Sequence, residues 1–213
     1  ILVLIGHYFL ELPAEMLDEA DKLDVPIITM PASIPIGTVT KAVAYMMFSE
    51  RHSMRRGGEA LRDIIYGYDE DERSHFNTIE RAGYKLRKRS FVAVMRTSDG
   101  ALYEMTDTQH ILTDVCSVLN TPVAYIQKNR IVALTGTDDQ NSVHSLMEAG
   151  ERLVSLASEK YGLRNMYFAL GSQITSRNNI KSSYRDAVNT VRAIKVYPIS
   201  RKCRNYAELP AII

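Results

Sequence analysis

The sequence predicts two units of mixed α/β structure: a short unit with a parallel sheet over residues 1–50, and a longer α+β unit over residues 89–213. Three observations favour this class. Two apolar runs flank a helical pattern near the N-terminus, apolar runs alternate with helical patterns after residue 89, and a double glycine lies between the two regions. The 213 residues are enough for one or two domains with a sizeable core.

Charge and cysteine content exclude several classes of protein. The chain has 26 Lys and Arg against 25 Asp and Glu, which argues against a nucleic-acid binder along its whole length but leaves room for a basic patch. Its two cysteines, Cys116 and Cys203, are too few for a disulfide framework or a four-cysteine zinc site. We therefore expect a reduced, cytoplasmic protein with no metal and no cofactor.

The first unit is predicted to be a βαβ arrangement. Residues 1–5 form an apolar run that is too short to span a membrane and lacks the basic flank of a signal peptide, so they indicate a buried strand. Residues 13–23 have helical spacing after a proline, and residues 25–31 form a second apolar run. Strand, helix and strand in this order predict a parallel pair, followed by a helix over residues 36–50. Because the chain starts inside a strand and without Met, we expect a further segment before residue 1.

A helical linker is predicted over residues 51–88. Residues 51–58, with the sequence RHSMRRGG, lack a sustained apolar period and end in two glycines, so we expect a break between units there. A short helix around residues 61–65, an acidic turn at 69–72 and a helix over 74–85 follow.

The remaining residues alternate between strands and helices. The predicted strands are residues 91–96, 122–127, 131–135 and 166–171, and the predicted helices lie around 111–119, 143–161 and 180–194. The order β-α-β-β-α-β followed by α predicts the split βαβ arrangement of ferredoxin-like domains, an antiparallel sheet with helices on one face.

Three segments resemble a known family. Gly171-Ser172 and residues 180–193, with Ser183, Tyr184 and Ala187 at its recurrent positions, resemble the signature of the GGDEF-like regulatory domain in PucR/CdaR-type bacterial transcription regulators. Residues 12–31 resemble the end of the N-terminal purine-catabolism-regulator domain of that family, and residues 205–209 resemble the segment that leads to its helix-turn-helix.

The resemblance implies a cytoplasmic regulator of catabolic genes. Its partners would be a small-molecule metabolite effector and further copies of the same chain, as a homodimer or higher oligomer, and no membrane. DNA would be contacted only through a C-terminal helix-turn-helix that this sequence, ending at Ile213, does not contain.

Active GGDEF-type domains condense nucleotides, so we also consider whether this chain is an enzyme. That chemistry needs carboxylates on the first strand and in the central hairpin to hold magnesium. The first predicted strand is followed by Asp99, but the hairpin at residues 127–130 has no carboxylate and carries Lys128 and Arg130 instead; Asp138 and Asp139 follow later, where they could equally cap a helix. We therefore expect no catalytic residues. A divergent nucleotide cyclase or phosphodiesterase stays open as an alternative, and so does a ligand-free interaction scaffold.

An effector site is predicted in the first unit. Gly6 and His7 follow the first strand, and Thr29 and Ser33 lie in and after the second. Ligands of open α/β sheets gather at the carboxyl ends of the strands, so these four residues are the candidate effector-binding set, with an ordinary surface loop as the alternative.

Other side chains are predicted to serve structure or assembly. Residues 45–48, which include Met46 and Met47, leave their helix apolar on more than one face, which favours a homodimer seam. Cys116 is expected in the core. Basic clusters at residues 51–56 and 85–89 are expected to form a solvated face or ion pairs.

Overall fold

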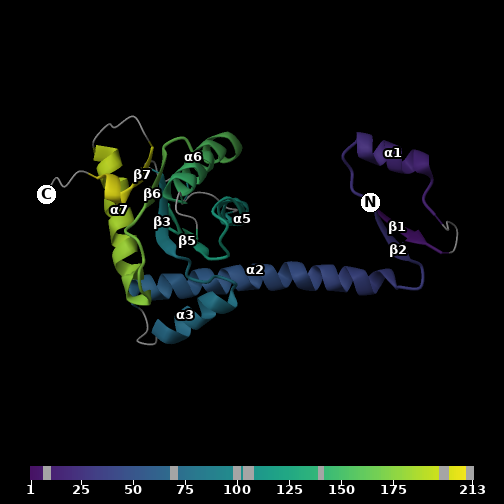
Figure 1. The fold of residues 1–213 in the computed structure, drawn as a ribbon, viewed down its shortest axis with the longest axis horizontal. Coiled ribbons are helices and arrows are strands. Elements are labelled where there is room, and N and C mark those ends of the chain that lie inside the picture. Colours follow the sequence, from purple (N-terminus) through teal and green to yellow (C-terminus); the bar gives the residue numbers. More distant parts are fainter. Residues whose placement is uncertain are drawn as a thin grey trace. The chain divides into compact units, whose positions relative to one another are not determined.

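The computed structural model describes residues 1–6, 11–67, 72–97, 102, 108–138, 142–196 and 202–209 (Figure 1). The chain divides into two compact units, Ile1–Glu50 and Arg51–Ile213. Each is described by itself.

The first unit contains the predicted parallel strand pair. Strands β1 (Leu2–Ile5) and β2 (Ile28–Pro31) pair in parallel, and helix α1 (Ala14–Lys22) connects them. The prediction of strand, helix and parallel strand is thereby confirmed. Among the described side chains of this unit, only Met30 is a buried apolar residue.

Helix α2 (Ile36–Tyr66) runs without interruption through residues 51–58, so the prediction that this helix ends near residue 50 is wrong, although the two units do divide between Glu50 and Arg51. Gly57 and Gly58 are buried within α2. A Cβ on Gly58 would overlap the carbonyl oxygen of Ala124, and one on Gly57 would lie 2.9 Å from the Cβ of Ala82. The two glycines therefore allow close packing of α2 on its neighbours and do not end the helix.

The second unit is built on a five-stranded sheet. Its strands are β3 (Arg89–Thr97), β4 (Ala124–Gln127), β5 (Arg130–Thr137), β6 (Met166–Leu170) and β7 (Cys203–Asn205). They lie in the order β4-β5-β3-β6-β7, with β3 antiparallel to both β5 and β6. The first four strands have the predicted ferredoxin-like arrangement. The short strand β7, parallel to β6, is an addition that the sequence pattern did not predict.

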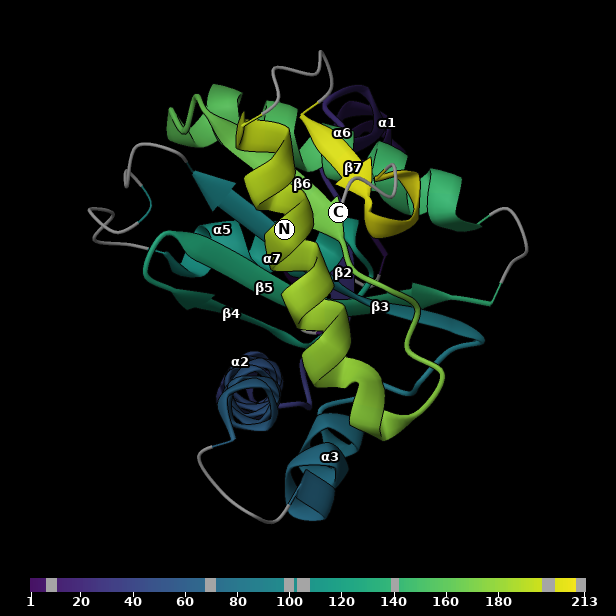
Figure 2. The ribbon, with the colours of Figure 1, turned by 90° about the vertical axis from the view of Figure 1, so that its left-hand side faces the viewer.

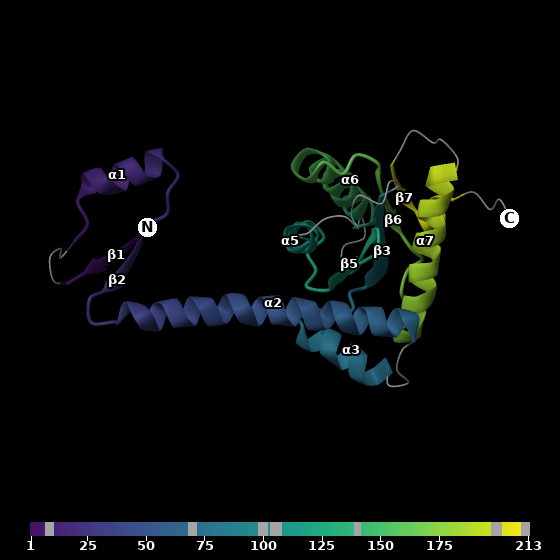
Figure 3. The same cartoon turned by 180° about the vertical axis from the view of Figure 1, so that it is seen from behind.

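Helices cover both faces of this sheet. Besides α2, the helices of this unit that the structure describes include α3 (Glu72–Arg81), α5 (Gln109–Val118), α6 (Ser142–Tyr161) and α7 (Ile180–Val196), with short 3₁₀ segments at Arg177–Asn179 and Tyr206–Glu208. Figure 3 shows α5 and α6 on one side of β3 and α7 on the other.

The prediction that helices cover one face only is therefore wrong, and strand β3 gives the reason. Phe91, Ala93 and Met95 belong to the core under α5 and α6, while Val92 and Val94 belong to the core shared with α2, α3 and α7. A strand that is apolar on both sides needs cover on both sides.

The signature residue Ser183 connects α7 to the sheet. Its hydroxyl accepts a hydrogen bond from the Val92 N–H at 3.0 Å and donates one to the Ser172 carbonyl at 2.7 Å. A Cβ on Gly171 would overlap the Ser183 carbonyl oxygen, and Ala187 is fully buried one turn further along the helix. The small residues of the signature thus let α7 lie directly on β3 and β6, as Figure 2 shows for α7.

Within the described residues, no helix is long and apolar enough to cross a membrane.

Candidate functional site

The candidate site lies at the hairpin end of the sheet in the second unit. Strands β4 and β5 are joined by a two-residue turn, Lys128-Asn129, in which Lys128 takes a positive φ of 54°. Gln127 pairs with Arg130, and Arg130 pairs with Arg96. Because directly opposed residues of antiparallel strands share a face, these three polar side chains form a row across β4, β5 and β3.

Arginines are concentrated around this row. Arg96 and Arg130 are opposed across β3 and β5, and Arg192 comes from α7 on the same face of the sheet. Burial lowers the pKa of Arg96, and the positive charges of Arg130 and Arg192 lower it further. We refer to Arg96, Arg130 and Arg192 as the arginine cluster.

Tyrosines hold one member of the cluster in place. Arg130 donates from Nη1 to the Tyr184 hydroxyl at 3.0 Å, and the Tyr184 and Tyr66 hydroxyls are 2.8 Å apart. The two rings meet edge to face, with centroids 6.0 Å apart. Burial and the hydrogen bond with Tyr184 raise the pKa of Tyr66 to about 12, so the Tyr66 hydroxyl stays protonated at neutral pH. This network fixes the Arg130 guanidinium against α2 and α7.

A cavity of about 210 Å³ opens beside the hairpin turn. Tyr66 and the residues of the turn, Gln127, Lys128, Asn129 and Arg130, line it. The lining therefore contains two cations, two amides and a phenol, and no carboxylate.

Carboxylates that could hold magnesium are not gathered here in the part of the chain that the structure describes. No group of three or more His, Cys, Asp or Glu side chains suited to a metal ion occurs among those residues. Asp138 accepts a hydrogen bond from the Lys88 N–H at 3.0 Å. Asp99 and Asp139 lie outside the described residues.

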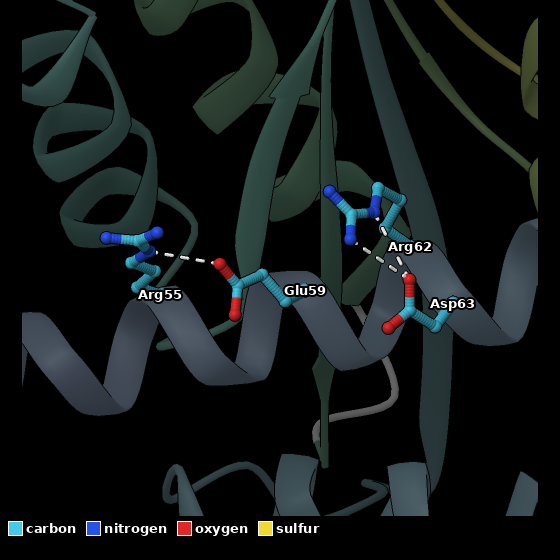
Figure 4. A network of polar contacts seen from close by, with 4 residues as sticks. All are labelled: Arg55, Glu59, Arg62 and Asp63. Atoms are coloured by element: carbon cyan, nitrogen blue, oxygen red, sulfur yellow. Dashed lines mark hydrogen bonds and ion pairs between the residues drawn. The ribbon is translucent and has the colours of Figure 1, made fainter.

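A second cavity, of about 230 Å³, lies between α2, α5 and the edge strand β4. Its charged side chains are paired within α2: Arg55 donates to Glu59 at 3.0 Å, and Arg62 donates to Asp63 at 3.2 Å (Figure 4). Because Arg55 and Arg62 are already paired with carboxylates, their charges are less available to a ligand. The cavity therefore offers a ligand fewer free donors than the hairpin end does.

The predicted effector residues of the first unit are only partly brought together. Gly6 has a φ of +124° and lies beside Ala32, whose neighbour is Ser33, because the Ala32 N–H donates to the Ile5 carbonyl at 2.7 Å. Thr29 lies further back on β2, opposite Val3, and both Thr29 and Ser33 are exposed.

His7 lies outside the described residues, so its place in the predicted set stays a prediction. One cavity of this unit, of about 250 Å³, has none of the four residues in its lining. It is lined by Val3, Leu12, Pro13, Glu15 and Met16.

The two cysteines and Arg87 of the second basic cluster make contacts within the protein. Cys116 and Cys203 are free and buried, and burial raises the pKa of each thiol to about 12. Arg87, in the second basic cluster, donates to the carbonyls of Gly136 and Asn120.

Met46 and Met47 lie in α2, but their side chains are outside the described set, so the dimer seam stays a prediction.

Sequence reasoning missed the arginine cluster. Its members come from three elements that are far apart in the chain, and each looks like an ordinary surface cation in its local pattern. The available signal was that Arg96 directly follows the apolar run 91–95 and Arg130 directly precedes the apolar run 131–134.

Taken together, the fold and the hairpin define an α+β domain of ferredoxin-like topology with a cationic hairpin end. The chain belongs to the family described as the GGDEF-like domain, whose model matches residues 67–193, more than half of the chain. The GGDEF-like part of the resemblance seen in the sequence is thereby confirmed. A search among curated proteins found no match.

Proposed function

We propose that the chain is the effector-sensing and oligomerisation region of a bacterial transcription regulator that controls metabolic genes, and that it has no catalytic activity. The GGDEF-like match and the motif order of PucR/CdaR-type regulators support this assignment. In this proposal the protein is cytoplasmic, and DNA is contacted by a helix-turn-helix that these residues do not contain.

One observation carries the non-catalytic part of the proposal. Nucleotide condensation on this fold needs magnesium between carboxylates at the first strand and the central hairpin. At that end of the sheet, Arg96 and Arg130 are opposed and Lys128 forms the turn. Positive charge at this place repels a divalent cation, which supports a regulatory role for the domain over a cyclase role.

A turnover assay tests this part. The purified chain is incubated with GTP or ATP and Mg²⁺, or with cyclic dinucleotides for the phosphodiesterase alternative, and products are separated by chromatography. We expect no product. Turnover that disappears in the Asp99→Asn variant would establish the enzyme alternative.

The sensing part is tested by thermal unfolding in the presence of purines and catabolic metabolites. A ligand that binds only the folded chain raises the free energy of unfolding by RT ln(1 + [L]/Kd). The unfolding midpoint therefore rises as well. We expect at least one compound to do so. If none does, the scaffold alternative replaces the sensor.

The oligomerisation part is tested by light scattering. We expect at least a dimer at micromolar concentration, because residues 45–48 make their segment of α2 apolar on more than one face. A monomer at that concentration contradicts the proposed dimer.

A further inference from the structure

We infer that the hairpin end of the second unit binds a small, multiply charged oxyanion, held by Arg130 and Lys128 at the cavity beside the turn, with Arg96 and Arg192 adding positive charge next to it. This inference goes beyond the proposed function, because it concerns the GGDEF-like domain and not the predicted effector residues of the first unit. It holds whether or not the chain regulates transcription.

The charge balance of the site points to an anion. Arg96 and Arg130 are opposed on neighbouring strands, and like charges placed directly opposite destabilise a sheet. Among the described residues, the structure gives Arg96, Arg130 and Arg192 no carboxylate partner. Partly buried cations that repel one another are stabilised when an anion neutralises them.

Unused donors are present at the same place. The Nε of Arg96 is buried and has no hydrogen-bond partner, although leaving a buried N–H without a partner is unfavourable. Arg130 uses Nη1 toward Tyr184, which leaves its other guanidinium N–H groups in a fixed orientation. A guanidinium presents its donors in a planar fork that matches the oxygens of a carboxylate or phosphate.

The space available favours a small ligand. The cavity of about 210 Å³ beside Arg130 and Lys128 has the volume of roughly seven water molecules at about 30 Å³ each. Sites for drug-sized ligands and cofactors are usually larger, at about 300–1,000 Å³. The Gln127 carboxamide lines the cavity with an unpartnered buried Oε1, and a half-turn of the amide would present its NH₂ as a further donor.

The test measures anion binding to the full chain. Thermal unfolding is recorded with increasing inorganic phosphate or, in a second arm, sodium succinate, each compared with NaCl of equal ionic strength. We expect at least one of the two anions to raise the unfolding midpoint beyond the NaCl control. The arm that responds tells whether phosphate or carboxylate groups are preferred.

Variants locate the effect. Arg130→Gln and Arg192→Gln should weaken the apparent affinity at least tenfold, and Arg192, being exposed, can be replaced without risk to the fold. Arg152→Gln is the matched control, because Arg152 is an exposed arginine on α6, which packs on the opposite face of the sheet. Wild-type affinity is expected for it.

The proposal is overturned if neither anion shifts the midpoint more than NaCl does. It is also overturned if Arg152→Gln loses as much affinity as Arg192→Gln, since the effect would then be general charge screening. Nucleotide turnover by the chain would overturn the proposed function and leave the oxyanion site standing, so the two failures are distinguishable.

Discussion

Arg96 and Arg130 face each other as direct cross-strand partners on β3 and β5, next to the apolar runs 91–95 and 131–134 of the two strands. A pair of like charges at such a position is unfavourable by itself. Tyr184 binds one of the two guanidinium groups, and Arg192 adds a third positive charge from α7. The relationship makes the hairpin end a place where like charges are concentrated at a cost in stability.

Repulsion within the cluster should make stability depend on ionic strength. Raising NaCl from about 0.01 M to about 0.15 M shortens the Debye length from about 30 Å to about 8 Å, so we expect the unfolding midpoint to rise. This salt-induced rise of the midpoint should be smaller in Arg192→Gln than in wild type. In Arg152→Gln it should equal that of wild type. Equal salt dependence of all three proteins would show that the cluster does not repel measurably.

Close packing of α2 on β4 should make Gly58 intolerant of any side chain. Gly58→Ala forces a methyl group against the Ala124 backbone, and overpacking of this kind costs about 1–3 kcal/mol. Gly37→Ala is the control in the same helix, since a Cβ at Gly37 meets nothing within 4 Å, and it should gain up to about 1 kcal/mol of stability. Urea denaturation followed by circular dichroism measures both, and a neutral Gly58→Ala would contradict the packing described for α2.

The Ser183 hydroxyl should matter more than that of its neighbour. Ser183→Ala leaves the buried Val92 N–H without an acceptor, which costs about 1–3 kcal/mol. Ser182→Ala removes a single bond to the Asn179 carbonyl at a half-buried position and should cost less than about 1 kcal/mol. Denaturation midpoints of the two variants in one buffer give the comparison, and equal losses would contradict a specific role for Ser183.

Both thiols should be inert in the folded chain. Burial raises the pKa of Cys116 and Cys203 to about 12, so at pH 8 roughly one thiol in ten thousand is ionised. We expect Ellman's reagent to react with neither cysteine at that pH until denaturant is added. Fast reaction of Cys203 in the native protein, checked with Cys203→Ser, would instead assign it the reactive role that its basic neighbours Lys202 and Arg204 allow.

Stability should fall at alkaline pH, in part through Tyr84. Its hydroxyl donates to the Thr135 carbonyl at 3.1 Å inside the core, and burial raises the pKa of Tyr84 from 10.0 to about 12. Because the folded state favours the protonated phenol, its contribution is complete below pH 10 and is lost as pH rises toward 12, up to about 3 kcal/mol.

Urea midpoints at pH 9, 10 and 11 measure this loss. Tyr84→Phe is less stable at pH 9 because the hydrogen bond is gone, but its decline with pH should be shallower than that of wild type. Parallel declines would mean that other groups carry the alkaline sensitivity.

The sequence by itself determined the element order and most of the topology of this protein. Local apolar periods are set by the geometry of strands and helices, so the parallel pair of the first unit and the β-α-β-β-α-β order of the second could be predicted. The signature around Ser183 and Ala187 likewise predicted the GGDEF-like domain, because it is a contiguous packing motif.

Only the tertiary structure decided the rest. Gly57 and Gly58 have the appearance of a helix end in the sequence, and their close contact with strand β4 and with Ala82 explains why they lie in mid-helix. The arginine cluster needs β3, β5 and α7 to be assembled, because its members lie far apart in the chain and only packing brings their charges together. Local sequence patterns reflect the geometry of single helices and strands. A binding site depends in addition on which helices and strands the core packs side by side.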